Sequence, residues 1–166
     1  MKIRYAEVFD AERITEIDVN GWQCAYGGLL PADFLALRGY SEERVKRWCE
    51  RLQKHDDIVL VAEDENGRVI GFVWGGKGRD KRIDRPVELY AFYVDPAEQG
   101  KGYGRALFEV FAKEAGADFY LFMLEGNAKA ARFYEKNGCV LQAARAKTEA
   151  IGGTIIREVC YFYDVK

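Results

Sequence analysis

The sequence predicts one α/β domain over residues 1–166, of the α+β type, built on a mixed sheet with helices on both faces. Two observations carry this prediction. Short apolar and aromatic runs, which favour strands, alternate with stretches of helical periodicity in the order β-α-α-β-β-β-α-β-α-β-β. The chain shows no repeat, linker or low-complexity segment, and its 166 residues are enough to bury a substantial core.

The first third of the chain is predicted to form one strand followed by helices. Asp10 is a good N-cap for the first helix, which is expected to end near Gly21. Ser41 caps a later helix, with two glutamates in its first turn. The expected bounds and core positions are a strand over 2–8, apolar helix positions Ile14 and Ile17, an irregular aromatic stretch over 22–30, a short helix between Pro31 and Gly39, and buried positions Val45, Trp48, Cys49 and Leu52.

The rest of the chain predicts six strands and two helices. Asn66-Gly67 is a strong signal for a two-residue hairpin turn, and a flexible basic loop is expected over 75–86. The remaining elements are strands over 58–62, 69–74, 88–94 and 119–124, a helix from 106 to about 114 that ends at Gly116, a helix from Asn127 to Gly138, and a closing hairpin of 139–147 with 154–163 around Gly152-Gly153.

Composition and charge narrow the functional classes. The formal net charge of −2 argues against a general role in binding nucleic acid or membrane surfaces. The apolar runs are about six residues long and the N-terminus has no signal-peptide layout, so a cytoplasmic location is expected. No metal site is expected, because the four cysteines show neither C-x-x-C spacing nor a histidine partner. The lone histidine, His55, is expected in a surface loop.

A strand, a turn and a glycine-rich loop precede a helical pattern within residues 88–105. Asp95-Pro96 ends the strand, and Gly100, Gly102 and Gly104 follow at every second position. Since glycine has no Cβ, backbone N–H groups in such a loop can wrap a phosphate at a positive helix N-terminus. The spacing excludes the G-x-G-x-x-G dinucleotide fingerprint, and no G-K-[ST] is present for a P-loop. The alternative is a turn in which the glycines serve only the backbone conformation and no ligand binds.

Two blocks of sequence resemble those of one family. Gln99-x-x-Gly102-x-Gly104 resembles the Q/R-x-x-G-x-G/A pyrophosphate loop of the GNAT superfamily of acetyl-CoA-dependent N-acetyltransferases. The segment from Asn127 to Gly138 is similar to the N-x-x-A-x-x-F-Y-x-x-x-G block that follows this loop in the family. The resemblance implies the GNAT fold, a largely antiparallel twisted sheet of about seven strands. It also implies acetyl-CoA as the co-substrate and direct acetyl transfer without an acyl-enzyme.

The resemblance further implies which residues contact acetyl-CoA. The backbone of the strand before the loop would pair with the pantetheine arm, and the N–H groups of the loop would bind the pyrophosphate. Asn127 would bond the pantetheine amide, with helix capping alone as the alternative. Lys101 and Arg132 are assigned to the outer phosphates on charge alone. The expected set is Phe92, Tyr93, Val94, Gln99, Gly100, Lys101, Gly102, Tyr103, Gly104, Arg105, Asn127, Arg132 and Phe133.

The catalytic candidates are Tyr134 and Glu88. By resemblance, Tyr134 is the acid that protonates the departing thiolate of CoA. A tyrosine pKa of about 10 exceeds that of a thiol near 8.5, so either the site lowers the pKa of Tyr134 or its hydroxyl mainly donates a strong hydrogen bond. Glu88 is the candidate base, because a period of two places it on the strand face of Phe92 and Val94. A solvated charge at the strand end is an equally good interpretation of Glu88.

The acceptor is expected to be a primary amine of a small molecule or peptide. Trp22 and Tyr26 are candidate walls of its pocket, with core packing as the alternative. Deprotonating a lysine-like amine at pH 7 costs roughly 4.6 kcal/mol, against about 1.4 for an α-amine, so a base matters most for the first. Lys77, Arg79, Lys81 or Arg82 of the basic loop could meet an acidic acceptor or partner, although charged loops are usually only solvated.

Three alternatives stay open at the level of sequence. The chain could be a catalytically silent CoA-binding or sensory module with the same fold. It could use another acyl donor, such as succinyl- or propionyl-CoA. The closing hairpin also offers a sheet edge of the kind through which homologues dimerise, so a homodimer is one alternative for the oligomeric state.

Overall fold

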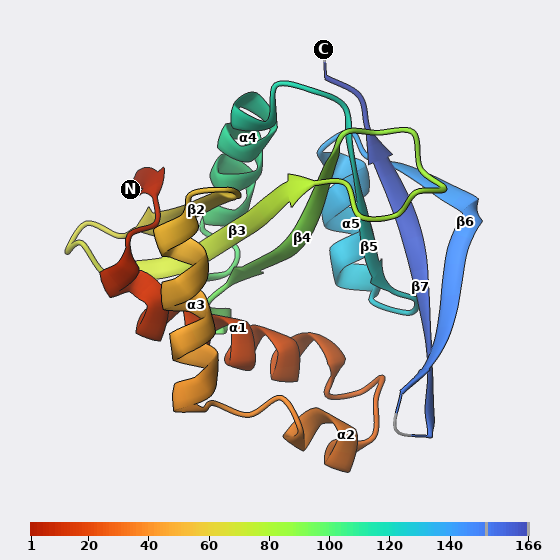
Figure 1. The fold of residues 1–166 in the computed structure, drawn as a ribbon, viewed down its shortest axis with the longest axis horizontal. Coiled ribbons are helices and arrows are strands. Elements are labelled where there is room, and N and C mark those ends of the chain that lie inside the picture. The colour runs from red at the N-terminus through yellow and green to blue at the C-terminus, as the bar shows by residue number, and fades with distance from the viewer. Residues whose placement is uncertain (152, 166) are drawn as a thin grey trace.

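A computed structural model describes residues 1–151 and 153–165. Within these residues seven strands form one sheet in the order β1-β2-β3-β4-β5-β7-β6 (Figure 1), and β4 with β5 is its one parallel pair. The predicted mixed, largely antiparallel sheet is therefore confirmed. The strands are β1 (Lys2–Tyr5), β2 (Ile58–Glu63), β3 (Val69–Lys77), β4 (Val87–Val94), β5 (Phe119–Leu124), β6 (Val140–Ile151) and β7 (Thr154–Tyr163).

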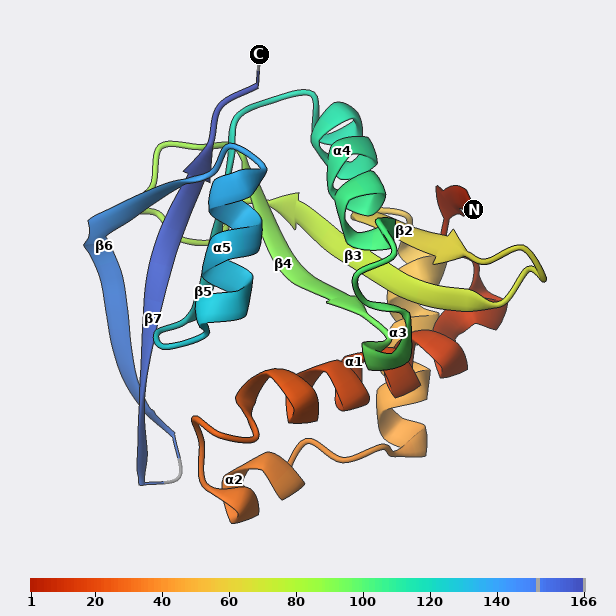
Figure 2. The same ribbon diagram turned by 180° about the vertical axis from the view of Figure 1, so that it is seen from behind.

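Helices cover both faces of the sheet, as predicted (Figures 1 and 2). On one face, α1 and α3 bury Ile14, Ile17 and Trp48 against Phe72 of β3. On the other face, α4 and α5 enclose the larger core, which includes Phe108. The helices are α1 (Ala11–Tyr26), α2 (Ala32–Ala36), α3 (Glu42–Lys54), α4 (Tyr103–Ala115) and α5 (Ala128–Lys136), with short 3-10 turns η1 (Val8–Asp10) and η2 (Pro96–Glu98).

Most of the predicted helix ends are confirmed. The side chain of Ser41 accepts a hydrogen bond from the backbone N–H of Arg44 at the start of α3. Gly116 follows α4 in the left-handed conformation, with φ at 59°. The Asp10 prediction is wrong in its chemistry, because the Asp10 carboxylate accepts from Arg4 at 2.6 and 2.9 Å and makes no cap bond to α1. The long arginine offers a stronger, charged donor than the helix N–H groups.

The prediction that α1 ends near Gly21 is wrong, because the helix continues to Tyr26. A Cβ at Gly21 would lie 2.4 Å from the ring of Tyr93, so the glycine lets α1 cross β4 at close range. Glycine here serves packing between elements rather than helix termination. Trp22 and Tyr26 consequently lie on the last turns of a regular helix and not in an irregular stretch.

Gly21→Ala is expected to destabilise the protein by about 1–3 kcal/mol, because the added methyl group must displace either α1 or the ring of Tyr93. Urea unfolding measures the change. Gly28→Ala is the matched control, since a Cβ at Gly28 meets nothing within 4 Å. If Gly21→Ala were as stable as Gly28→Ala, the close crossing of α1 and β4 would be disproved.

The predicted β2–β3 hairpin forms, but its connection is longer than two residues. The carboxylate of Asp64 accepts from the N–H groups of Asn66 and Arg68 at 2.8 and 3.0 Å, so the loop spans 64–68. An aspartate that bonds backbone groups ahead of it competes with a tight two-residue turn. The closing hairpin of β6 and β7 is confirmed. Gly152, which belongs to that prediction, lies outside the described residues.

Strand β4 contains a bulge that reverses the direction of its side chains. Trp74 of β3 pairs with Ala91 and Gly75 pairs with Leu89, so Tyr90 is an extra residue in β4. Leu89 packs in the core beneath α4, whereas Ala91 packs beneath α1 and α3. The expectation that Glu88 shares a face with Phe92 is therefore wrong, because one inserted residue shifts the period-two alternation.

Candidate functional site

A cleft of about 900 Å³ opens where β4 and β5 separate. The two strands are paired only from Val87 to Leu89 in β4, and beyond Leu121 the edge of β5 diverges from its neighbour. The cleft is lined by β4 from Leu89 to Val94, by the glycine loop, by α5 and by the C-terminal end of α1. The second half of β4 therefore presents a strand edge to the cleft, with backbone groups that a ligand could pair.

The glycine loop joins β4 to α4 along one wall of this cleft. Gly100 and Gly102 have φ values of 83° and 90°, a region that other residues rarely adopt, and α4 begins at the next residue, Tyr103. Gly100, Gly102 and Gly104 all line the cleft. The first N–H groups of an α-helix have no partner within the helix, so this end of α4 can bind an anion.

Polar side chains tie the loop to its surroundings. The amide of Gln99 donates to the carbonyl oxygen of Val94 at 3.0 Å and accepts a hydrogen bond from Lys129. Lys101 pairs with Glu98, and Arg105 pairs with its neighbour Glu109 one turn along α4 at 2.7 Å. Lys129 therefore ties the loop to α5, whereas the Arg105–Glu109 pair lies within α4.

The predicted acetyl-CoA residues divide into those that line the cleft and those that do not. Lys129 lines it but was missed, because a lysine in the first turn of α5 carries no distinctive sequence signal. Lys101, Tyr103 and Arg132 belong to no wall of the cleft, and Arg132 is exposed. The predicted residues that line the cleft are Phe92, Tyr93, Val94, Gln99, Gly100, Gly102, Gly104, Arg105, Asn127 and Phe133.

Asn127 and Tyr134 lie at the two ends of α5 and both line the cleft. Asn127 caps the helix by accepting from the N–H of Ala130 at 3.1 Å. Tyr134 is 7% exposed, and its hydroxyl bonds to no other described residue. Burial raises the pKa of Tyr134 far above its ordinary value, with smaller contributions from Tyr26 and Cys139. Its hydroxyl is therefore a proton-bearing donor without a protein acceptor.

Two further tyrosines line the cleft from the side of α1. Burial raises the pKa of Tyr26 and, more strongly, that of Tyr93. The interaction between the two hydroxyls makes a smaller contribution to both pKa values. Trp22 packs edge-on against Tyr26, with a centroid separation of 4.4 Å, under the guanidinium of Arg38. Trp22 and Glu88 are not part of the cleft wall, so of the three residues predicted to bind the acceptor only Tyr26 reaches it.

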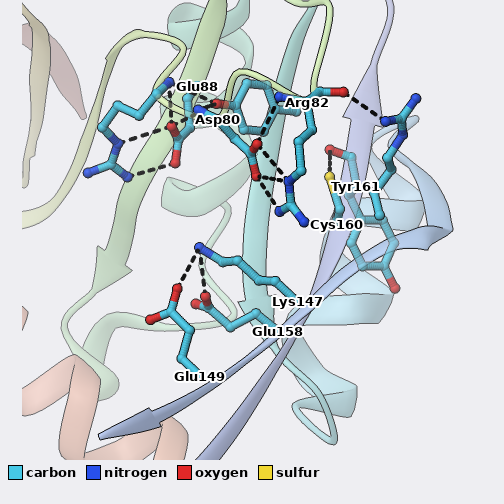
Figure 3. A network of polar contacts seen from close by, with 11 residues as sticks. Asp80, Arg82, Glu88, Lys147, Glu149, Glu158, Cys160 and Tyr161 are labelled. Atoms are coloured by element: carbon cyan, nitrogen blue, oxygen red, sulfur yellow. Dashed lines mark hydrogen bonds and ion pairs between the residues drawn. The ribbon is translucent and has the colours of Figure 1, made fainter.

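Glu88 lies on the opposite face from Phe92 and is 4% exposed. Arg79 donates to its two carboxylate oxygens at 2.6 and 3.0 Å, and the Tyr120 hydroxyl donates to one of them at 2.9 Å (Figure 3). Burial alone would raise the pKa of Glu88, but the hydrogen bonds and charge of Arg79 outweigh it and lower the pKa. Glu88 is thus an ionised, fully partnered carboxylate.

Glu88→Gln is expected to destabilise the protein by about 1–3 kcal/mol at pH 7, because Arg79 and Tyr120 lose a charged acceptor. The folded state lowers the pKa of Glu88, so its stabilisation is present above the unfolded-state pKa and is lost as the pH falls through the folded-state pKa. Urea unfolding at pH 7 and at roughly pH 3 should show a wild-type advantage that narrows in acid. Glu149→Gln, which removes a 57% exposed carboxylate with a 3.9 Å ion pair, is the control. An unchanged stability of Glu88→Gln at pH 7 would contradict the expectation.

Two features are absent from residues 1–151 and 153–165. This part of the chain has no group of three or more His, Cys, Asp or Glu residues arranged to hold a metal ion. None of its helices has the length and hydropathy needed to cross a bilayer.

Most of the residues that line the cleft lie in a block of sequence that matches a family model. Residues 55–138 match the family model for the acetyltransferase (GNAT) domain, and this range includes the glycine loop, Asn127 and Tyr134. The chain belongs to the GNAT acetyltransferase family. Solved GNAT structures have the same fold: the GCN5-related N-acetyltransferase from Rhodopseudomonas palustris aligns with a TM-score of 0.76 at 20% identity, over 99% of this chain and 95% of that one.

Three further comparisons extend this GNAT assignment. The N-acetyltransferase YuaI of Bacillus subtilis is 37% identical over 119 residues, which are 72% of this chain and 64% of that protein. The L-methionine sulfoximine/L-methionine sulfone acetyltransferase of Salmonella typhimurium is 35% identical over 115 residues, 69% of this chain and 63% of that protein. The chain thus spans less than two thirds of either relative. The yncA structure from Salmonella typhimurium, solved with its cofactor acetyl-CoA, has a TM-score of 0.72 at 25% identity, over 100% of this chain and 94% of that one.

Proposed function

We propose that this protein is an acetyl-CoA-dependent N-acetyltransferase that moves the acetyl group directly to a primary amine of a small molecule or peptide. The observation that carries the proposal is the cleft between β4 and β5. It brings together, in one cavity, the glycine loop, the Asn127 cap and the hydroxyl of Tyr134, which bonds to no other described residue. The relatives named for acetyl transfer and the acetyl-CoA present in the yncA structure support the same chemistry.

The cleft residues fit acetyl-CoA along its length. The edge of β4 beyond Leu89 would pair through its backbone with the pantetheine arm, as a neighbouring strand does. The N–H groups from Gln99 to Gly104 and the start of α4 would bind the pyrophosphate. Arg105 and Lys129 line this end and would add positive charge. Lys101 and Arg132 lie outside the cleft wall and are proposed for the outer phosphates on charge alone.

Tyr134 supplies the hydrogen-bond donor for the departing sulfur. As the amine nitrogen bonds to the acetyl carbon, the carbon–sulfur bond breaks and negative charge develops on sulfur. Because burial raises its pKa, the Tyr134 hydroxyl stays protonated at neutral pH. Of the two roles open from the sequence, donation of a strong hydrogen bond is therefore favoured over a tyrosine made acidic by its site.

Removal of the proton from the amine is the second requirement. Glu88 stays our proposed base, acting through water, although its contacts with Arg79 and its lowered pKa make it a weak one. A weak base suits an α-amine, which costs only about 1.4 kcal/mol to deprotonate at pH 7, better than a lysine-like amine at roughly 4.6. We therefore favour acceptors with an α-amine over those with a lysine-like amine.

The direct test is release of free thiol from acetyl-CoA over a panel of primary amines. Acetylation of at least one amine supports the proposal. CoA binding without turnover on any amine would instead identify a silent CoA-binding module. Propionyl- and succinyl-CoA, tested in parallel, separate the donor alternatives. Since Cys24 also lines the cleft, turnover by Cys24→Ala would support direct transfer over an acyl-cysteine route.

A homodimer through the closing hairpin also stays a proposal. Strand β6 is an edge of the sheet, and Val140 and Leu141 near its start are exposed. Such an edge can pair with a second copy. Light scattering across a concentration series would measure the oligomeric state.

A further inference from the structure

A second hollow, of about 590 Å³, lies beside the separation of β4 and β5. It is bounded by the loop between β3 and β4 and by β6, and we call it the charged basin. Phe122 lines both the basin and the cleft, which makes the two cavities neighbours. Figure 3 shows the acid–base pairs in and around the basin, with Asp80 and Arg82 on one side and Lys147 near Glu149 on another.

Arg79 stands at the junction of the basin and the cleft. Its guanidinium carbon lies 3.9 Å from the ring centroid of Tyr90, the bulge residue, which lines the cleft. Two of its nitrogens, Nε and Nη2, donate to Glu88, the residue just before the last β4–β5 pair. The guanidinium is therefore fixed in orientation by an ion pair and by stacking on an aromatic face.

The outer edge of this guanidinium remains available. Nη1 of Arg79 makes no hydrogen bond to any described residue, and the side chain is 60% exposed. Glu88 is also bonded by the Tyr120 hydroxyl and by the backbone N–H of Arg79, at 2.9 and 3.1 Å, so its charge is offset by several donors. Lys81 lines the same basin and forms no ion pair within the described residues. Rigid, unsatisfied guanidinium donors next to surplus positive charge suit a carboxylate.

We infer that Arg79 binds the carboxylate of an acceptor that carries its primary amine on the same small molecule, as an α-amino acid does. With the carboxylate on the outer edge of Arg79, the amine points past Tyr90 to the mouth of the cleft. This inference rests on the proposed acetyltransferase function. It adds to that function the acceptor class and a specificity residue, Arg79.

The test compares matched acceptors. L-methionine, L-glutamine and L-phenylalanine are each assayed as the free acid and as the carboxamide, with spermidine as a carboxylate-free amine. The wild type is expected to prefer free acids by at least about 10-fold in kcat/KM. Arg79→Lys keeps the charge beside Glu88 but loses the planar fork. It should raise KM for the acids, relative to KM for the matched carboxamides, by about 10- to 100-fold, a ratio in which an effect of Glu88 on both acceptors cancels. Arg47→Lys, which alters an exposed arginine of α3 outside both cavities, is the control.

The outcomes separate the inference from the proposed function. Equal use of acids and carboxamides, a preference for spermidine, or an unchanged KM in Arg79→Lys would overturn the inference and leave acetyl transfer standing. Failure of every amine overturns the proposed function. In that case calorimetry of the free acids on the CoA-loaded protein still tests Arg79, and absence of binding or equal binding by Arg79→Lys overturns the inference. A thermal melt of Arg79→Lys checks its folding. The double variant Arg79→Gln/Glu88→Gln leaves no unpaired carboxylate, and calorimetry of the free acids measures its binding without depending on Glu88 as a base; binding equal to the wild type would overturn the inference.

Discussion

Tyr134→Phe is expected to lower kcat about 100-fold while the affinity for CoA stays within about threefold. The variant removes the hydroxyl that would stabilise the leaving sulfur and keeps the ring that packs in the core. Because that hydroxyl bonds to no other described residue, its loss leaves no partner unsatisfied and should not destabilise the fold. Steady-state thiol release gives kcat, and calorimetry with CoA gives the affinity.

Tyr161→Phe is the matched control for this experiment. Tyr161 is 3% exposed and lies in the same core, but its hydroxyl bonds to Glu135 and it does not line the cleft. Its turnover should stay within about twofold of the wild type. Wild-type kcat in Tyr134→Phe would show that Tyr134 is not the donor to sulfur, whichever amine is acetylated.

Gly102→Val is expected to weaken CoA binding at least about 100-fold, or roughly 2.7 kcal/mol. Gly102 has a φ of 90°, which a β-branched residue scarcely adopts, so the loop must change shape at the start of α4. The valine side chain would also stand where the phosphate approaches the N–H groups. Calorimetric titration with CoA measures the loss.

Gly67→Val is the control that separates the effect of backbone strain from the loss of the anion site. Gly67 has a φ of 78° in the loop between β2 and β3 and does not line the cleft. Both variants should lose stability in urea by about 1–2 kcal/mol, whereas only Gly102→Val should lose affinity for CoA. Equal CoA affinity in the two variants would refute the role of the glycine loop.

Local chemistry made much of this molecule predictable from the sequence. Ser41 and Asn127 each cap a helix, because the side-chain oxygen accepts a hydrogen bond from the backbone N–H three residues later. Such a contact is local and depends on no distant part of the chain. The same locality explains why the glycine loop and the start of α4 follow β4 as expected. Fold class followed from the order of these local elements.

The failures involve contacts between distant segments. Local rules predicted that the helix would end at Gly21, but Gly21 lies within α1, where it packs against Tyr93 of β4. The bulge at Tyr90 depends on the register with β3, so the direction of Glu88 could not be read from period two. The Arg79–Glu88–Tyr120 network likewise joins a loop and two strands, which no spacing in the sequence reveals.

The separation of β4 from β5 also sets how the two halves of the molecule communicate. Within the described residues, the strand ladder between the half that contains β1 to β4 and the half that contains β5, β7 and β6 has three residue pairs. Backbone amides on the cleft edge of β4 should exchange with deuterium quickly in the free protein and slowly once acetyl-CoA fills the place of a missing strand. Bound acetyl-CoA would then bridge β4 and β5. It would raise the melting temperature and make unfolding of the two halves more cooperative.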